Sequence, residues 1–249
     1  YLLKCLYELD SKKDFQDELD KEINNGTANA IIGSLINSSN LKFGTKKRNT
    51  FCENPLNYVL NINLKKEYDF EKIFVNTTNN FFNDQLVKDR PQPLLINGSQ
   101  SAGNFFNYKN DSVSKIKNII HKYLKTYHDT HKENEDGIIK NWPKNFELIG
   151  WLVKMNNGGS IKPHIHDHGW LSGSIYINVP KKLNNDGNLV ISISDEKKLI
   201  ESDDYSKNKK IINVETGSFC LFPSSLFHYT IPFKSDEERI VLAFDVISK

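Results

Sequence analysis

The feature that most constrains this chain is a set of alternating histidines directly before a strand-like segment. Three of the seven histidines, His164, His166 and His168, occupy alternate positions. Alternate side chains of an extended chain point to the same face, so two neighbouring imidazoles here can hold one metal ion. Residues 171–177 then form a β-type run that stops at Pro180. The pattern predicts a metal-binding pair at the start of a strand, although many His-x-His pairs are ordinary surface or core residues.

A third ligand has to come from elsewhere, and His228 is the best candidate. It stands at the end of a second apolar segment, and Arg239 follows it by eleven residues, at the start of the last apolar segment. Imidazole suits iron, copper, nickel and zinc, and the fork of an arginine can bind a carboxylate through two hydrogen bonds. Two strand-borne histidines, a distal histidine and a buried cation together suit an iron ion and an oxo-acid.

Composition limits the classes of partner. Among 249 residues, 33 are basic and 31 acidic, which gives a formal charge of +2 and no electrostatic case for binding nucleic acid or a membrane surface. No apolar run is long enough to span a bilayer, and the first residues do not form a signal peptide. The three cysteines are far apart and follow no pairing pattern. We therefore expect reduced thiols in a cytoplasmic protein.

The second half of the chain predicts a β-sandwich or barrel. Short apolar segments there alternate with turn residues, and we expect strands at 146–155, 172–179, 188–193, 211–214, 218–222, 227–231 and 239–246. Helical patterns come before them, so an α+β arrangement is expected, with helices packed on one side of the sheet. Residues 197–210 are charged and polar, which predicts a mobile surface loop that could cover the site.

The first half of the chain predicts mainly helices. We expect two helices within residues 1–40, separated at 24–26, and further helices at 69–85 and 111–128. Residues 56–64 alternate like a strand, and 99–108 look more like a loop than a strand. We divide the chain into an N-terminal helical segment, 1–45, and a second domain, 46–249, with its core at about 146–247. The first segment is typical of a cap or of the end of a helical repeat array, and its helices could bind a protein partner.

Five motifs, in order and spacing, resemble the Fe(II)- and 2-oxoglutarate-dependent dioxygenases of the prolyl-hydroxylase type, and more narrowly a bacterial and phage branch of hydroxylases. These motifs are His-x-His at 164–166, a strand ending in Tyr-x-Asn at 176–178, a Gly-rich hairpin, Gly-x-x-x-x-Phe-Pro at 217–223, and His228 followed by Arg239. The resemblance covers roughly residues 95 to 247. It implies a double-stranded β-helix, a jelly-roll or cupin-like core.

Carried across residue by residue, the resemblance makes His164 the first iron ligand and His228 the distal one. Arg239 and Tyr176 match the residues that bind the far carboxylate of 2-oxoglutarate. The chain departs from the family at His166, which stands where the usual triad has an aspartate. Three resolutions are open: His166 is a ligand in a three-histidine site, a bulge brings in Asp167, or the site uses two histidines and water. We favour the first, and place His168 outside the metal's ligands.

The resemblance implies an oxygenase that hydroxylates an unknown substrate with O2, using Fe(II) as cofactor and 2-oxoglutarate as cosubstrate, and releases succinate and CO2. The substrate is a small molecule or a protein. Two other classes stay open at this point, because fold alone does not decide function. One is a non-redox, cupin-like metal-binding domain, and the missing carboxylate keeps this alternative open. The other is an interaction module in which the barrel is a scaffold.

Overall fold

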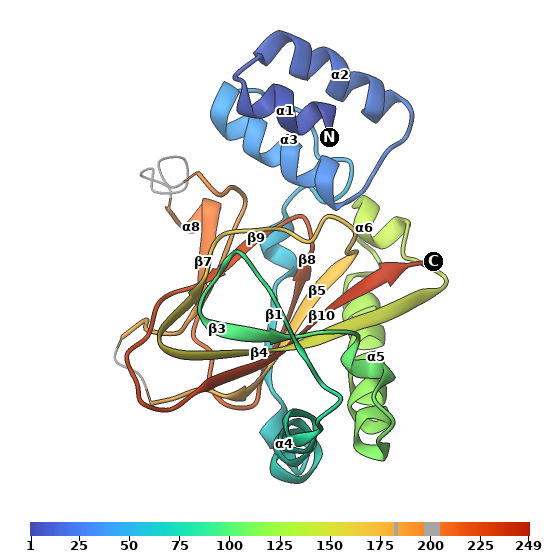
Figure 1. Ribbon diagram of the computed structural model, residues 1–249. Coiled ribbons are helices and arrows are strands. Elements are labelled where there is room, and N and C mark those ends of the chain that lie inside the picture. The colour runs from blue at the N-terminus through green and yellow to red at the C-terminus, as the bar shows by residue number, and fades with distance from the viewer. Residues whose placement is uncertain (182–183, 197–204) are drawn as a thin grey trace.

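Two antiparallel β-sheets form the centre of the molecule, and the computed structural model describes residues 1–181, 184–196 and 205–249 (Figure 1). The larger sheet has the strand order β1-β8-β5-β10-β4-β3-β2 and the smaller has the order β7-β6-β9. The strands are β1 (Leu60–Asn63), β2 (Asp89–Arg90), β3 (Leu95–Ser101), β4 (Phe146–Ile161), β5 (Leu171–Asn178), β6 (Leu189–Ser192), β7 (Lys209–Ile212), β8 (Ser218–Pro223), β9 (Phe227–Thr230) and β10 (Arg239–Ser248).

Side chains of the larger sheet alternate between two apolar layers. On β10, Leu242 and Phe244 pack into the layer beneath the helices, whereas Val241 packs in the layer between the two sheets. On β8, Phe219 and Cys220 divide in the same way. Successive residues of a strand point to opposite faces, so the odd-numbered residues of β10 face the smaller sheet. The candidate site described below is built on this inner face.

Helices cover the outer face of the larger sheet. The longest, α5 (Asp111–His131), begins after Asn110, whose side chain accepts a hydrogen bond from the Ser112 amide at 2.8 Å, and its apolar stripe packs on the sheet. The remaining helical elements are α1 (Leu2–Glu8), α2 (Lys12–Asn24), α3 (Ala30–Phe43), η1 (Pro55–Tyr58), η2 (Leu64–Lys66), η3 (Glu71–Val75), α4 (Asn76–Asn83), η4 (Phe105–Asn107), α6 (Gly137–Lys140) and α8 (Tyr205–Asn208). None of the described helices is long and apolar enough to cross a membrane.

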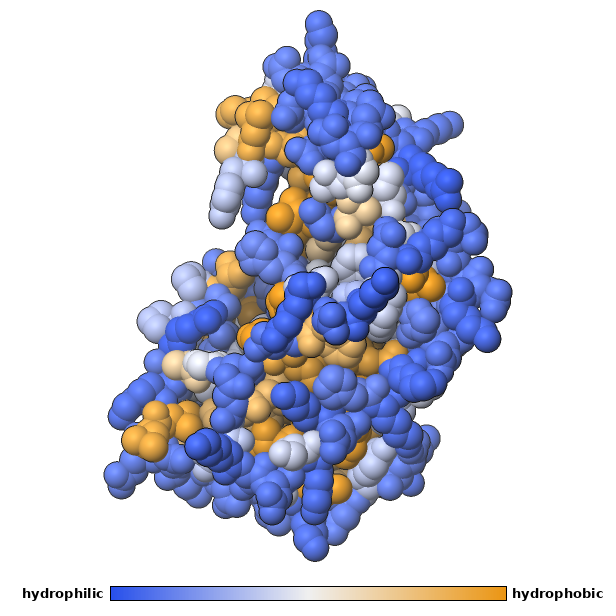
Figure 2. All heavy atoms as spheres, turned by 90° about the vertical axis from the view of Figure 1, so that its right-hand side faces the viewer, coloured by the Kyte–Doolittle hydropathy of each residue, from blue (hydrophilic) through white to orange (hydrophobic). Residues whose placement is uncertain are grey.

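The N-terminal helices form a layer of their own above the β-structure (Figure 1). Their apolar residues make a separate cluster around Phe15, Leu19 and Ile36. Polar contacts join them to the rest of the chain: the Tyr7 hydroxyl donates to Glu196 Oε1 at 2.8 Å. The face shown in Figure 2 is mostly hydrophilic, with apolar atoms in small areas between polar side chains. The division at residue 45 stays a prediction.

The structure corrects several local expectations. Three helices, not two, occupy residues 2–43, because the chain breaks at Asp10, which has a positive φ of 56°. Residues 95–101 form strand β3, which pairs with β4 and was not expected, although 99–108 as a whole is more loop than strand, as predicted. The predicted strand 56–64 begins with the short helix η1 before β1. Of the predicted surface loop 197–210, residues 197–204 lie outside the described residues, while 205–210 form α8 and the start of β7.

Candidate metal centre

The three histidines proposed as ligands meet where β4 has ended and β9 passes beside it. His164 forms an isolated antiparallel bridge with His228: the His164 amide donates to the His228 carbonyl at 3.3 Å, and the His228 amide donates to the His164 carbonyl at 2.9 Å. His166 follows before a turn in which the Gly169 amide donates to the His166 carbonyl at 3.0 Å. One ring nitrogen from each histidine lies within 4.8 Å of those of the other two. The fold therefore brings together side chains that the sequence places on separate segments.

Each of the three rings has a hydrogen-bond partner on Nδ1. His164 Nδ1 lies 2.8 Å from the Lys162 carbonyl, and His228 Nδ1 lies 3.3 Å from the Leu226 carbonyl. His166 Nδ1 lies 2.5 Å from Asp245 Oδ1. Carbonyl and carboxylate oxygens only accept, so these contacts place the proton on Nδ1. The lone pair of Nε2 is then free on each ring, which is the arrangement expected for metal-ligating histidines.

Burial keeps two of these rings neutral. Desolvation, followed by repulsion from His166, lowers the pKa of His164 to about 4. Desolvation also holds the pKa of His228 well below its ordinary value, with further lowering by the two neighbouring histidines. A histidine binds a metal only in its neutral form, so both rings are in the coordinating state at neutral pH.

A buried cation lies in the same cavity. Arg239, the first residue of β10, is 2% exposed and stands over the Tyr176 ring, 5.0 Å from its centroid. Its Nε donates to the Gly187 carbonyl at 3.2 Å, and Nη1 reaches Met155 Sδ at 3.8 Å. In the part of the chain that the structure describes, no acidic side chain pairs with it. Desolvation lowers the pKa of Arg239, but a guanidinium stays protonated in proteins, so a buried charge remains without a counter-charge.

The histidines and the arginine line one cavity, whose empty space, including the open solvent at its mouth, is about 630 Å³. Alternation along β5 explains why polar residues gather there: Ser172, Ser174 and Tyr176 face inward, while Ile175 packs beneath the helices. The Ser174 hydroxyl is buried in this cavity with no hydrogen-bond partner. A cation, a phenol and a hydroxyl without a partner lie together beside the histidines and could receive an anion; we call this group the anion pocket.

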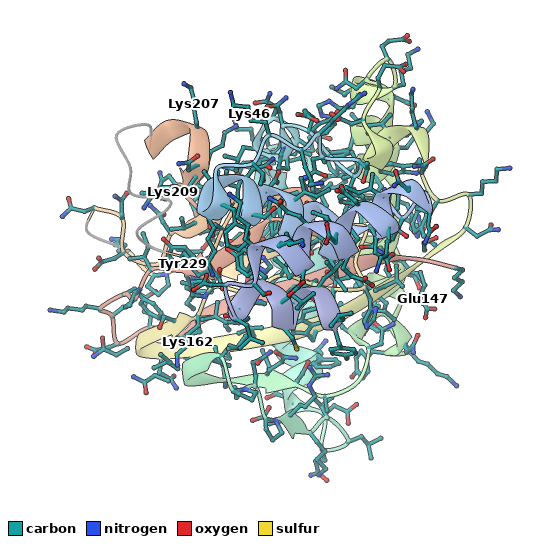
Figure 3. All side chains as sticks on the ribbon, turned by 90° about the horizontal axis from the view of Figure 1, so that it is seen from above. Lys46, Glu147, Lys162, Lys207, Lys209 and Tyr229 are labelled. Atoms are coloured by element: carbon teal, nitrogen blue, oxygen red, sulfur yellow. The ribbon has the colours of Figure 1, made fainter. Side chains whose placement is uncertain are left out.

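The other candidate residues lie outside the histidine cluster. Asp167 and His168 are exposed in the turn after His166. Trp151 lines the cavity, its ring 5.5 Å from that of His166, whereas Trp170 donates its ring N–H to the Ile138 carbonyl at 3.0 Å. Seen from above, Lys162 and Tyr229 lie on one side of the molecule and Glu147, at the far end of β4, on the other (Figure 3).

Sequence reasoning missed three polar residues of the site. Gln92 and Gln100 line the cavity, and Asp245 contacts His166 from β10. Asp245 did carry a signal, because it is a lone carboxylate within the otherwise apolar run 240–247. A charged residue in such a strand requires a partner when it is buried. The two glutamines gave no comparable signal, because Gln100 lies in 99–108, which was not interpreted as a strand, and Gln92 lies outside every predicted helix and strand.

Comparison with known proteins agrees with this geometry. The family described as "Putative 2OG-Fe(II) oxygenase" matches residues 150–245, a span that contains the three histidines, Tyr176 and Arg239. No curated protein matches the chain. The family match confirms the resemblance inferred from the motifs, together with the expectation of an iron- and 2-oxoglutarate-dependent enzyme.

Solved structures share the fold at low sequence identity. A prolyl-4-hydroxylase from Pseudomonas putida aligns with a TM-score of 0.53 and 10% identity, covering 77% of this chain and 92% of that one. A viral collagen prolyl hydroxylase from Paramecium Bursaria Chlorella virus-1, in complex with 2-oxoglutarate, aligns with a TM-score of 0.51 and 14% identity, covering 77% and 97%. HygX from Streptomyces hygroscopicus, with nickel, 2-oxoglutarate and hygromycin B bound, gives 0.51 and 11%, covering 77% and 83%. The expected double-stranded β-helix with packing helices is confirmed.

Proposed function

We infer that this chain, through residues 150–245 a 2OG-Fe(II) oxygenase, couples the oxidation of 2-oxoglutarate by O2 to the hydroxylation of a second substrate. One observation supports this conclusion most strongly. Three hydrogen-bonded histidines and one buried arginine, which has no counter-charge among the described residues, line the same cavity. The two kinds of group suit a metal ion and a dicarboxylate.

The donor set fits iron. Imidazole is a suitable ligand for Fe(II), and the Nδ1 partners orient the three rings so that each presents Nε2. We propose that His164, His166 and His228 hold the metal. Bound iron supplies the activation of O2, which is chemistry that no side chain of this cavity provides. His166 takes the place of the usual carboxylate, while Asp167 is exposed and lies outside the cluster.

The anion pocket fits the far carboxylate of 2-oxoglutarate. Arg239 offers a planar fork of donors, and a carboxylate there supplies the counter-charge that the described residues do not. Ser174 adds a hydroxyl donor, and the phenol of Tyr176 lies beside the guanidinium. Arg239 thus orients the cosubstrate, while the apolar walls exclude water from the anion pocket.

The substrate enters the part of the cavity that the cosubstrate leaves open. Trp151, Gln92 and Gln100 line the cavity without belonging to the metal ligands or to the anion pocket. An aromatic face and two carboxamides can position a polar organic group by stacking and by hydrogen bonds. We therefore assign substrate contact to these three residues.

The test is metal-dependent turnover of 2-oxoglutarate. Anaerobically prepared protein is loaded with Fe(II), mixed with 2-oxoglutarate and O2, and assayed for succinate. We expect succinate from the wild type and none above background from His228→Ala, with Asp167→Ala as the matched control that keeps its rate. A wild type that binds both Fe(II) and 2-oxoglutarate but forms no succinate contradicts the oxygenase and favours a non-redox metal-binding domain.

Two wider expectations remain proposals. We place the protein in the cytoplasm because Cys5, Cys52 and Cys220 are all free thiols. We also propose that the N-terminal helices α1–α3 bind a protein partner, and that the protein binds neither nucleic acid nor a membrane. The near-neutral formal charge of +2 supports the proposal that the protein binds neither nucleic acid nor a membrane.

A further inference from the structure

His166 differs from the other two histidines in the group that backs it. His164 and His228 face neutral backbone carbonyls, whereas His166 faces the carboxylate of Asp245 at 2.5 Å. The side chains of this pair are 15% and 11% exposed. In the described part of the chain, Asp245 is the only acidic residue in contact with any of the three histidines. His166 is therefore the proposed ligand whose Nδ1 contacts a carboxylate, whereas Nδ1 of the other two contacts a carbonyl.

The carboxylate is held by a network that several strands build together. Asp245 on β10 lies opposite Ser172 on β5 in the sheet register, and the Ser172 hydroxyl donates to Asp245 Oδ1 at 2.9 Å. Ser172 also lies 2.8 Å from the Ser224 hydroxyl, at the end of β8. Three segments of the inner face therefore fix the position of one carboxylate oxygen.

The turn after His166 closes over the same network. A Cβ placed at Gly169 would come within 2.4 Å of Ser224 Oγ and 3.3 Å of Asp245 Oδ1. Real Cβ atoms essentially never come as close as the first of these distances, so a side chain at position 169 would require Ser224 to move. This close approach indicates that the network is a built feature and that the fold sets the distance between Asp245 and His166.

We propose that Asp245 is a positioning residue that supplies, through His166, the negative charge which a carboxylate ligand would otherwise give the metal. The inference rests on the proposed function, because it assumes that His166 binds the metal. Three neutral imidazoles leave bound Fe(II) with its full charge of +2, and a carboxylate on Nδ1–H of one ligand lowers the charge of the site. It also fixes the ring and raises the basicity of Nε2.

The arrangement explains why aspartate is absent from the ligand position. The carboxylate lies one side chain further from the proposed metal position than a carboxylate ligand would, because the imidazole of His166 stands between them. Ser172 restrains the carboxylate, which keeps it directed at Nδ1. A serine or an asparagine at position 245 could accept the same hydrogen bond but would carry no charge. The charge of Asp245 is therefore the property to test.

The experiment measures Co(II) binding, as a spectroscopic substitute for Fe(II), by calorimetry and by visible absorption. Asp245→Asn keeps the shape of the side chain and removes its charge. We expect it to weaken Co(II) binding about 10- to 100-fold, as the loss of an outer-shell partner does, and to shift the absorption bands of bound cobalt. Metal-free wild type and variant are compared by thermal unfolding to check that both are folded.

A double-mutant cycle separates a role through His166 from a structural role. In the His166→Ala background, which keeps His164 and His228, Asp245→Asn should change the Co(II) affinity by less than about threefold, because the two sites no longer interact. An equal loss in both backgrounds overturns the inference, since Asp245 then acts only on the fold. If Asp245→Asn does not fold, Ser172→Ala is used in its place. Ser172→Ala should weaken Co(II) binding by a smaller factor, and this loss should vanish in the His166→Ala background.

The outcomes distinguish the two proposals. If the wild type binds Co(II) and Asp245→Asn binds it within threefold as tightly, the inference about Asp245 is wrong while the metal centre stands. If the wild type binds no Co(II), the metal centre itself is wrong. Both proposals are supported if Asp245→Asn weakens Co(II) binding in the wild-type background and has no such effect in the His166→Ala background.

Discussion

At one end of the cavity the three histidines all have hydrogen-bond partners on Nδ1, whereas at the other end Arg239 carries a charge that no described acidic residue neutralises. His228 of the histidine end lies on β9 of the smaller sheet, whereas Arg239 lies on β10 of the larger sheet, and both residues are buried. They differ in what is missing. The histidine end has complete hydrogen bonding on its outer side and free lone pairs inside, while the arginine end lacks a counter-ion.

The difference shows how one fold prepares two kinds of ligand site. Burying a hydrogen-bonded imidazole costs little free energy, so the histidine end can form in the absence of metal. A buried guanidinium without a counter-charge destabilises the ligand-free protein, so binding of an anion should stabilise the arginine end. Predictions that address each end separately can break or sharpen this comparison.

The largest effect is expected at the histidine end when a ligand is lost. His228→Ala removes one of three proposed ligands and should weaken anaerobic Fe(II) binding by more than the roughly 100-fold that losing an outer-shell partner costs. Thermal unfolding of the metal-free variant should stay cooperative. Calorimetry checks the affinity, with exposed His168→Ala as the control. Unchanged iron binding in His228→Ala removes this residue from the metal centre.

At the arginine end, affinity and stability should move in opposite directions. Arg239→Met should weaken 2-oxoglutarate binding by about 2–5 kcal/mol, the range for removing one partner of a buried charge pair. The same change should stabilise the ligand-free protein by about 1 kcal/mol or more, because an apolar side chain replaces an unpaired buried charge. Calorimetry and thermal unfolding measure the two effects. Arg239→Lys is the control that keeps the charge without the fork. A variant that loses stability instead shows that Arg239 is already compensated.

Acid should act mainly on the histidine end. The pKa of His164 is about 4 in the folded protein and near 6.5 when unfolded, so between these values the unfolded chain binds more protons. The free energy of unfolding of the metal-free protein therefore falls as pH decreases from about 6.5 to 4, by about 1–3 kcal/mol from this residue. His164→Gln should flatten the dependence. Burial also lowers the pKa values of His121 and His131, but these contribute equally to both proteins. Parallel curves for the two proteins contradict the prediction.

A smaller effect is expected from the unpaired hydroxyl of the anion pocket. Ser174 Oγ has no partner in the ligand-free cavity, so Ser174→Ala should cost little stability. If the hydroxyl binds the carboxylate of 2-oxoglutarate, the variant should bind it more weakly by about 0.5–1.5 kcal/mol, the net value of a typical hydrogen bond. Thr230→Ala, another cavity residue, serves as the comparison. Equal cosubstrate affinity for wild type and Ser174→Ala places the carboxylate elsewhere.

The smallest effect is expected at Asp167, and it tests the composition of the histidine end. The side chain is exposed and outside the cluster, so Asp167→Ala should change iron affinity by less than about 0.5 kcal/mol, as for other surface substitutions. His166→Asp, by contrast, should keep iron, because it restores the usual ligand set. Loss of iron in Asp167→Ala with retention in His166→Ala shows that a rearranged turn brings the aspartate to the metal.

Much of the site was predictable because its signals are local. The alternation of His164 and His166 and the apolar segments around His228 and Arg239 are properties of short stretches of chain. The structure brings all four into one cavity, together with Tyr176. The other strands of the second half lie within about two residues of their predicted bounds for the same reason, since the two-residue period of a strand is visible in sequence, but β4 continues to Ile161, well past its predicted end at 155.

The helical first half was harder, because a helix boundary depends on a single residue. Leu2, Leu6 and Leu9 follow a helical period, and this pattern alone does not show that Asp10 adopts a positive φ and breaks the helix. The segment ending at Ser101 was missed as a strand because it owes its extended form to pairing with β4 rather than to its own composition.

What the sequence determined by itself was the set of groups: three histidines, one arginine, and strands to carry them. What only the tertiary structure decided was their partners. Asp245 reaches His166 from a position 79 residues away, and Arg239 lies over Tyr176 because β10 pairs with β5. Hydrogen bonds act over about 3 Å, and spacing along the chain does not fix such distances between strands until the sheets have formed.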